Sequence, residues 1–203
     1  MSEIGLFPLG IVLLPGEQVP LHIFEPRYRE LIGECLETSS TFGLVLADDD
    51  SMREIGTQAS VIEMLEEFPD GRMNIVVEGG ARFRLVELTE GRSFATAEIA
   101  TLEDDGDAPT RDEIDQCVAA YDRVVRAADA EIDELDLEAP SIAYQIAARV
   151  DLGAEVKQDL LELLSERERI VMLAPLLDRA AEAVRREREI RERASMNGHV
   201  DSL

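Results

Sequence analysis

The chain begins its fold with the segment Leu6-Phe7-Pro8-Leu9-Gly10-Ile11-Val12-Leu13-Leu14-Pro15-Gly16. Two short apolar runs are separated by one glycine and are followed by a proline and a second glycine. Apolar runs of this length, bounded by turn residues, are typical of buried strands. The segment therefore predicts two strands, Leu6 to Leu9 and Ile11 to Leu14.

Short apolar runs separated by glycine and proline continue to about Glu103 and predict a β-rich region. The turn segment Phe68-Pro69-Asp70-Gly71 predicts a tight hairpin, because proline presets φ and glycine accepts a positive φ. Gly79-Gly80 predicts a bend or bulge, since strand-like sequence resumes directly after it. The further strands are expected at Val19 to Phe24, Phe42 to Ala47, Thr57 to Phe68, Arg72 to Glu78, Arg82 to Leu88 and Phe94 to Leu102.

Only one helix is expected in this half, from Pro26 to Leu36. Proline suits the first helical position, where its missing N–H costs nothing. A single apolar face is then formed by Tyr28, Leu31, Ile32, Cys35 and Leu36. Several strands with one short helix predict a partly closed, barrel-like sheet whose open end the helix fills.

An acidic connector from Glu103 to Pro109 ends the β-rich half. Thr110 to Glu113 forms a capping box, and an apolar stripe predicts a helix reaching about Glu134. Ser141 caps a second helix that ends near Gly153, a third contains Leu160, and a fourth follows Ser165. We expect a β-rich subdomain over 1–103, a helical subdomain over 110–194 and a disordered tail over 195–203, hence an α+β protein.

The fourth helix contains Pro175, which removes a backbone hydrogen bond and predicts a kink or break near Met172 to Ala174. Beyond Val184, opposite charges recur three and four residues apart and only Ile190 is apolar. Such a segment can be helical but buries little surface.

Composition excludes several functions. The 203 residues carry 20 Lys+Arg against 44 Asp+Glu, a formal net charge of −24, which repels nucleic acid and anionic membranes. Lys157 is the one lysine and follows no glycine, so a P-loop is excluded. The start of the chain lacks signal-peptide features and no stretch is long and apolar enough to span a bilayer, so we expect a cytoplasmic protein.

Groups that could support catalysis or hold a metal are scarce. Cys35 and Cys117 lie on apolar helix stripes, as small buried hydrophobes do. His22 is expected on a strand, facing away from its two apolar neighbours, and Lys157 on a helix surface. The acidic run of residues 48–50 lacks the ligand spacing of a calcium loop. We therefore expect no catalytic residues, no metal site and no cofactor.

Soft apolar residues gather near the hairpin and the acidic loop. Flexible thioethers beside an aromatic ring suit adaptable apolar recognition, although packing in the core explains them equally well. The candidate polypeptide-binding residues are Met52, Met64, Phe68 and Met73.

Several segments, in the same order along the chain and at similar spacing, resemble the substrate-binding N-terminal domain of the Lon protease family. They are residues 6–16, then Val19 to Tyr28, Ile55-Gly56-Thr57, Pro69-Asp70-Gly71, Val77 to Phe83, Ser141 to Val150 and Asp159 to Glu162. The resemblance covers residues 4–190. It implies a PUA-like pseudobarrel of about six strands, followed by an α-helical bundle that ends in a long helix.

The resemblance also implies binding of damaged or degron-bearing polypeptides by a stand-alone form without the ATPase and protease domains. Such a module would act as an adaptor, regulator or chaperone-like factor in proteolysis, with a protease or ATPase as partner. The alternatives are an RNA-binding PUA-type domain, a small-molecule-binding domain and a hydrolase. RNA binding needs a basic stripe, and Arg82 and Arg84 are instead expected to pair with acidic side chains. The oligomeric state stays open.

Overall fold

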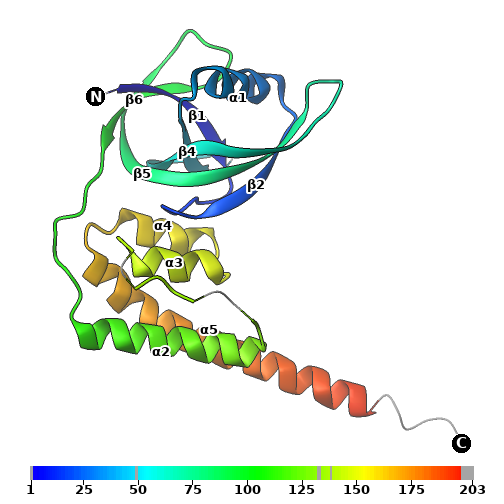
Figure 1. Cartoon of the computed structure of the whole chain (residues 1–203), viewed down its shortest axis with the longest axis vertical. Coiled ribbons are helices and arrows are strands. Elements are labelled where there is room, and N and C mark those ends of the chain that lie inside the picture. The colour runs from blue at the N-terminus through cyan, green and yellow to red at the C-terminus, as the bar shows by residue number, and fades with distance from the viewer. Residues whose placement is uncertain (1, 49, 132–133, 138, 198–203) are drawn as a thin grey trace, which may run out of the picture. The chain divides into compact units, whose positions relative to one another are not determined.

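The structure is a computed structural model that describes residues 2–48, 50–131, 134–137 and 139–197. Within these ranges the chain forms six strands and five helices (Figure 1). The elements are β1 (Ser2–Leu9), β2 (Gln18–Ile23), α1 (Pro26–Thr38), β3 (Phe42–Ala47), β4 (Met52–Glu67), β5 (Met73–Thr89), β6 (Thr96–Thr101), α2 (Arg111–Ala128), α3 (Ile142–Arg149), α4 (Ala154–Glu162) and α5 (Glu166–Asn197).

The strands form one sheet in the order β2-β5-β4-β3-β1-β6, and β5 pairs again with β6. This second pairing closes the sheet into a pseudobarrel. The sheet and the helices together confirm the expected α+β class. Closure depends on the length of β5: its first part pairs with β2 and its last part with β6. The two strands expected at Arg72 to Glu78 and Arg82 to Leu88 are therefore one strand, and a register shift lies at the predicted bulge.

The prediction of a strand from Ile11 to Leu14 was wrong, although these residues supply buried side chains. Residues 10–17 instead form a turn against β5, with Gly16 at φ 77°. The Gly16 N–H donates to the Gly79 carbonyl at 2.7 Å, and the Gly79 N–H donates to the Glu17 carbonyl at 2.9 Å. A Cβ on Gly79 would lie 2.2 Å from the Leu14 carbonyl oxygen, so this approach requires glycine.

Helix α1 packs into the main core of the pseudobarrel through four of the five residues of its predicted apolar face. The fifth, Leu36, is 40% exposed, so its assignment to the buried face was wrong. Pro26 stands at its first turn, and Ser39 ends it with a left-handed φ of 53°. The helix contributes Tyr28, Leu31, Ile32 and Cys35 to a cluster that also contains Phe7, Leu13, Ile23, Phe42, Leu44, Ala59, Met73, Ile75, Val77 and Phe94.

The chain divides into two compact units. Unit 1 comprises residues 1–104 and 147–164, and unit 2 comprises residues 105–146 and 165–203. This division differs from the expected boundary between 1–103 and 110–194, because α4 packs with the strands of unit 1. The Gln158 side chain of α4 donates to the Ile55 carbonyl at 3.1 Å. Lys157 pairs with Glu17 at 2.5 Å, so the prediction of a surface lysine was wrong.

Arg82 of β5 also holds α4 in unit 1. Its side chain is 5% exposed and donates to the carbonyls of Leu161 and Leu163, at 2.6 Å each. It also pairs with Asp104, so the expected pairing of Arg82 with an acidic side chain is confirmed. The guanidinium thereby satisfies two carbonyls at the end of α4, where a helix has no internal donors left.

In unit 2, α2 and α5 pack along each other through apolar stripes. The predicted capping box at Thr110 and Glu113 is present. The helix ends at Ala128, not near Glu134, because Asp129 adopts a left-handed φ of 54° and its N–H donates back to α2. Residues 132 and 133, which the predicted helix would have included, lie outside the described residues.

Helix α5 continues through Pro175, so the helix is not broken there, and the alternative of a kink near Met172 to Ala174 stays a prediction. It reaches Asn197, which makes residues 195–197 helical instead of part of a disordered tail; residues 198–203 lie outside the described part. A buried ion pair near its start joins Arg169 to Glu166 at 3.0 Å. Among the described helices, none has the length and apolar character required to cross a bilayer.

Replacement of Arg82 should destabilise unit 1. We expect Arg82→Ala to lower the free energy of unfolding by about 3–5 kcal/mol, because Asp104 and two carbonyls lose a buried donor. Arg84→Ala is the matched control, since Arg84 lies on the same strand but makes a solvent-exposed pair with Glu54 at 3.4 Å. Its cost should stay below about 1 kcal/mol. Urea denaturation measures both, and equal losses would contradict this role of Arg82.

Candidate functional site

The outer half of the β4–β5 hairpin has an open sheet edge. Strand β3 pairs with β4 only through Ala59, so in the described structure residues 60–67 of β4 pair with β5 alone. We call this hairpin end, residues 60–77, the arm. An open edge carries backbone N–H and carbonyl groups that a further extended chain can bind.

Two bulges expose apolar side chains on the arm. Ile62 and Leu65 are the extra residues at two register shifts, because each lies between paired residues of β4 whose partners in β5 are adjacent. A bulged residue is withdrawn from the ladder and bends the strand. Both side chains are exposed, Leu65 at 53%. The arm thus presents apolar groups where an exposed strand usually carries polar ones.

An aromatic cluster, formed by His22, Phe24 and Phe68, lies beside the turn of the arm. The His22 ring stacks on Phe24 at a centroid distance of 5.8 Å and meets the edge of Phe68 at 6.3 Å. The Arg72 guanidinium lies 5.0 Å from the centre of the Phe68 ring. Phe24 is 59% exposed, so the cluster offers one accessible aromatic face.

A polar row fixes this outer face of the sheet. The His22 Nδ1 lies 2.6 Å from the Asn74 Oδ1, and the Asn74 amide donates to Glu66 at 3.3 Å. His22 lies opposite Asn74 in the β2–β5 ladder, while its neighbour Ile23 is buried. The predicted orientation of His22 is therefore confirmed, and its polar contacts hold the ring that Phe24 and Phe68 contact.

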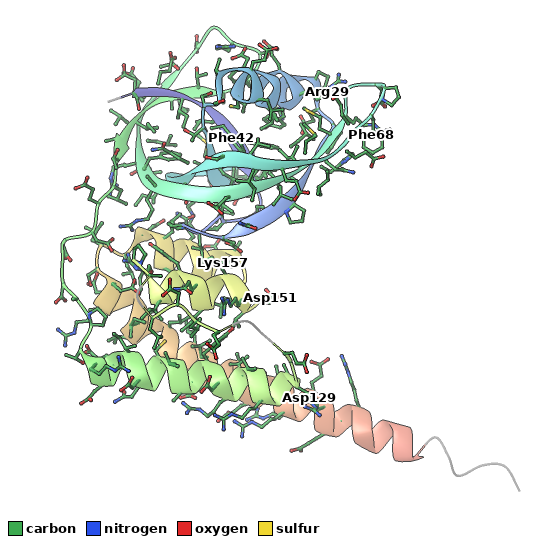
Figure 2. The ribbon with its side chains drawn as sticks, viewed as in Figure 1. Arg29, Phe42, Phe68, Asp129, Asp151 and Lys157 are labelled. Atoms are coloured by element: carbon green, nitrogen blue, oxygen red, sulfur yellow. The ribbon has the colours of Figure 1, made fainter. Side chains whose placement is uncertain are left out.

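The predicted hairpin turn is present and is anchored to α1. The Gly71 N–H donates to the Phe68 carbonyl at 2.9 Å, with Gly71 at φ 81°. Arg29 of α1 donates to the Asp70 carbonyl, and Figure 2 shows Arg29 and Phe68 at the same end of unit 1. The pKa of Asp70 lies below its ordinary value because the Arg72 backbone N–H, and then the Arg72 side chain, favour the carboxylate.

The structure separates the four candidate binding residues. Met64 is exposed on the arm and Phe68 is half-buried in the aromatic cluster. Met73 is 7% exposed and belongs to the main core. Met52 is half-buried against a second core cluster. Met64 is therefore the most accessible of the four, Phe68 and Met52 are partly accessible, and the packing explanation accounts for Met73.

Sequence reasoning missed Phe24, Ile62 and Leu65. A signal for the latter two is present, because Val61-Ile62 and Met64-Leu65 are adjacent apolar pairs that break the alternation of a half-buried strand. Such a break predicts bulges. Phe24 could not be recognised, because its exposure depends on where β2 ends.

The arm carries mostly negative charge. Glu63, Glu66 and Glu67 lie on β4, and Asp70 lies in the turn. Charged side chains beside an open edge hinder pairing with an identical edge, since like charges repel. They also attract basic partners at long range.

The acidic loop before β4 is a turn motif. Asp48 Oδ1 accepts from the Asp50 N–H at 2.9 Å, and from the Ser51 N–H at 2.7 Å. These backbone donors, Asp50 first, hold the pKa of Asp48 below its ordinary value. Asp49 lies outside the described residues. In the part of the chain that is described, no three His, Cys, Asp or Glu side chains are arranged to hold a metal ion.

Two of the residues that could support RNA binding are buried. Stacking on bases would need accessible arginines beside Phe83, but Arg82 and Phe83 are both buried. Arg84 is exposed and pairs with Glu54. This strand therefore offers no continuous basic and aromatic surface.

Comparison with known proteins identifies the family of the chain. The sequence profile of the ATP-dependent protease La (LON) substrate-binding domain matches residues 3–179. This match covers most of the chain, and the chain therefore belongs to that family. The resemblance stated from the sequence is confirmed.

Two full-length relatives show how much of a Lon protease the chain matches. Lon protease 1 of Hydrogenovibrio crunogenus is 23% identical over 205 residues, covering 90% of this chain and 24% of that protein. The Lon protease of Brucella suis is 26% identical over 214 residues, covering 93% and 25%. The chain thus spans about a quarter of the length of these relatives.

A solved structure shares the fold. The crystal structure of a Lon N-terminal domain protein from Xanthomonas campestris has a TM-score of 0.67 and 24% sequence identity. The match covers 85% of this chain and 97% of that one. It supports the pseudobarrel and helical architecture.

The two thiols should be unreactive in the folded protein. Both are buried and free, and burial raises the pKa of Cys117 to about 12, with a smaller contribution from the charge of Glu166. Because only the thiolate reacts, we expect negligible labelling by a disulfide reagent at pH 8 and full labelling of Cys35 and Cys117 in denaturant. Rapid labelling of either native thiol would contradict this assignment.

Proposed function

We propose that the chain binds exposed apolar segments of other polypeptides through the arm and the aromatic cluster. The observation that carries this proposal is the display of Phe24, Ile62, Leu65 and Phe68 beside an open sheet edge. Apolar side chains can contact those of a client, while the free backbone edge can pair with its main chain. This second interaction does not depend on sequence, which suits a binder of varied polypeptides.

The size of the site indicates weak and transient binding. Complete burial of a Phe or Leu side chain contributes about 1.5–3 kcal/mol. Phe24 and Leu65 are only partly exposed before binding, so each contributes less than this. Association and ordering of a flexible client cost several kcal/mol, so we expect dissociation constants near the micromolar range. Such binding allows release of the client to a further component.

The charge of the arm favours basic clients. Glu63, Glu66 and Glu67 lie next to the exposed apolar residues, and the whole chain carries −24. Electrostatic attraction raises the association rate and is screened by salt. Association should therefore slow as salt increases, while apolar contacts hold or strengthen.

Family membership directs the proposal towards proteolysis. The matched relatives are Lon proteases, and the family is described by substrate binding. We therefore place the clients among unfolded or degron-bearing polypeptides, with this chain as their non-enzymatic recognition module. An ATP-dependent protease is the matching partner, in which the module acts as an adaptor or regulator.

Loss of exposed apolar groups from the site should weaken polypeptide binding. We expect Phe24→Ser with Leu65→Ser to raise the dissociation constant for a fluorescent peptide of alternating Leu and Arg by about 10-fold or more, because two apolar contacts are removed. Fluorescence anisotropy measures the change. Both residues are exposed, so the fold should persist, and circular dichroism verifies it.

The matched control changes Val86→Ser with Leu88→Ser on the other half of β5. These side chains are exposed to nearly the same extent, at 51% and 57%, but lie outside the arm. The control should bind as the unchanged protein does. Equal weakening by both double variants would show unspecific apolar binding, and unchanged binding by the first would place the site elsewhere.

A further inference from the structure

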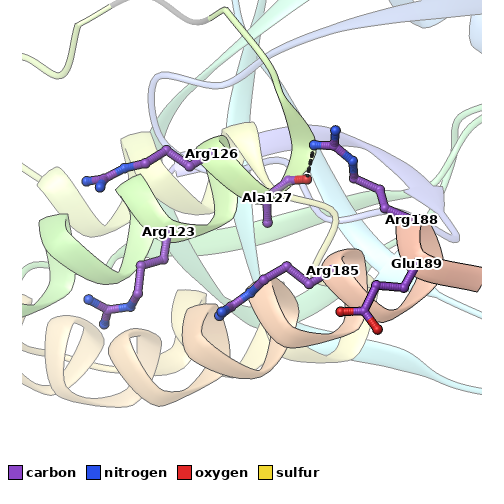
Figure 3. Close-up of a pocket in the computed structure, with 6 residues that line it drawn as sticks. All are labelled: Arg123, Arg126, Ala127, Arg185, Arg188 and Glu189. Atoms are coloured by element: carbon purple, nitrogen blue, oxygen red, sulfur yellow. Dashed lines mark hydrogen bonds between the residues drawn. The ribbon is translucent and has the colours of Figure 1, made fainter. Parts of the chain in front are cut away.

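Unit 2 contains a hollow in which four of the six lining residues are arginines. Its volume is about 410 Å³, within the range of small-molecule sites. It lies between the last turns of α2 and the middle of α5, and Figure 3 shows Arg123 and Arg185 facing it from the two helices. The lining residues are Arg123, Arg126, Ala127, Arg185, Arg188 and Glu189.

This gathering of positive charge contrasts with the rest of the chain. The sequence has 20 Lys+Arg against 44 Asp+Glu, yet four arginines line this single hollow. Like charges placed together repel one another, so the arrangement needs counter-charges. Those provided by the protein itself decide whether the hollow can accept an external anion.

Arg123 and Arg188 have structural contacts. Arg123 donates to Asp178 of α5 at 2.8 Å, which joins the two helices. Arg188 donates to the Ala127 carbonyl at 2.9 Å, which gives a donor to a carbonyl in the last turn of α2. The Asp129 Oδ2 lies 4.0 Å from the Arg188 guanidinium. These two side chains hold the walls of the hollow together.

Arg126 and Arg185 are the more available pair. Arg126 contacts Asp122 at 3.7 Å, a long and exposed ion pair one turn away. Arg185 donates through Nε to the Ala181 carbonyl at 3.2 Å. The exposed Arg126–Asp122 pair is weak because water screens it, so a ligand with a higher charge density can replace it. The contact of Arg185 uses Nε and leaves its two terminal nitrogens for a ligand. Each guanidinium retains further N–H donors for such a ligand.

We propose that this hollow binds a compact, multivalent phosphate anion of the tripolyphosphate type. Guanidinium groups bind phosphate oxygens through paired N–H donors, and several phosphates in a chain can contact several arginines together. Four carboxylates, Asp122, Asp129, Asp178 and Glu189, reduce the local positive charge. A singly charged anion is therefore a poor competitor, and a multivalent one is required.

The grouping of the arginines favours a compact ligand over an extended acidic peptide. An extended acidic segment would need a row of arginines along a surface, whereas these four line one hollow. The site lies wholly in unit 2, while the arm lies in unit 1. Phosphate binding and polypeptide binding can therefore succeed or fail independently.

The test measures tripolyphosphate binding to the full chain by calorimetry at low salt. We expect Arg126→Gln with Arg185→Gln to weaken binding by about 10-fold or more. Arg185→Lys should give a smaller loss, because lysine keeps the positive charge but lacks the paired N–H donors of a guanidinium. The matched control, Arg186→Gln with Arg191→Gln, removes the same charge from exposed residues of α5 that lie outside the hollow. It should bind within twofold of the unchanged protein.

Further probes identify the source of the phosphate chain. Equal binding of ATP and tripolyphosphate would indicate recognition of the phosphates alone, and tighter binding of ATP would add a nucleoside contact. Equal weakening by the test and control variants would overturn the proposal in favour of diffuse charge. Absence of binding, or tighter binding of polyglutamate or a single-stranded oligonucleotide, would also overturn it. Thermal unfolding of each variant separates loss of the site from loss of the fold.

Discussion

Unit 1 depends on the buried guanidinium of Arg82. A buried positive charge is tolerable only when it is paired and its donors are satisfied. Arg82 meets this requirement through Asp104 and two carbonyls at the end of α4, all distant from it in the sequence. The contacts with the two carbonyls hold α4 in unit 1. Unit 1 is therefore assembled from two separate segments of the chain.

Local signals in the sequence predicted the local elements. Pro26 with one apolar face predicted α1, the residues around Gly71 predicted the hairpin, and Thr110 with Glu113 predicted the start of α2. Each of these features involves residues a few positions apart. The assignment of α4 to unit 1 depends instead on contacts such as Lys157 with Glu17, which no local pattern encodes.

The candidate site was predictable only in part, because strand periodicity does not say which face is buried. Met64 and Met73 carry the same side chain on paired strands of one hairpin, yet Met64 is exposed and Met73 belongs to the core. Met73 lies in the core cluster to which α1 also contributes, whereas Met64 does not belong to that cluster. Bulges at Ile62 and Leu65 then shift the exposed positions by one residue each.

The divided construction of unit 1 also affects its synthesis. Its first segment ends at residue 104, but the second segment, which contains α4, is complete only when residue 164 has been made. Translation proceeds at about 5–20 residues per second, so these 60 further residues take about 3–12 s. During this interval the nascent pseudobarrel has Arg82 and Glu17 without their partners from α4. The pseudobarrel therefore reaches its final contacts only after α2, α3 and α4 have been synthesised.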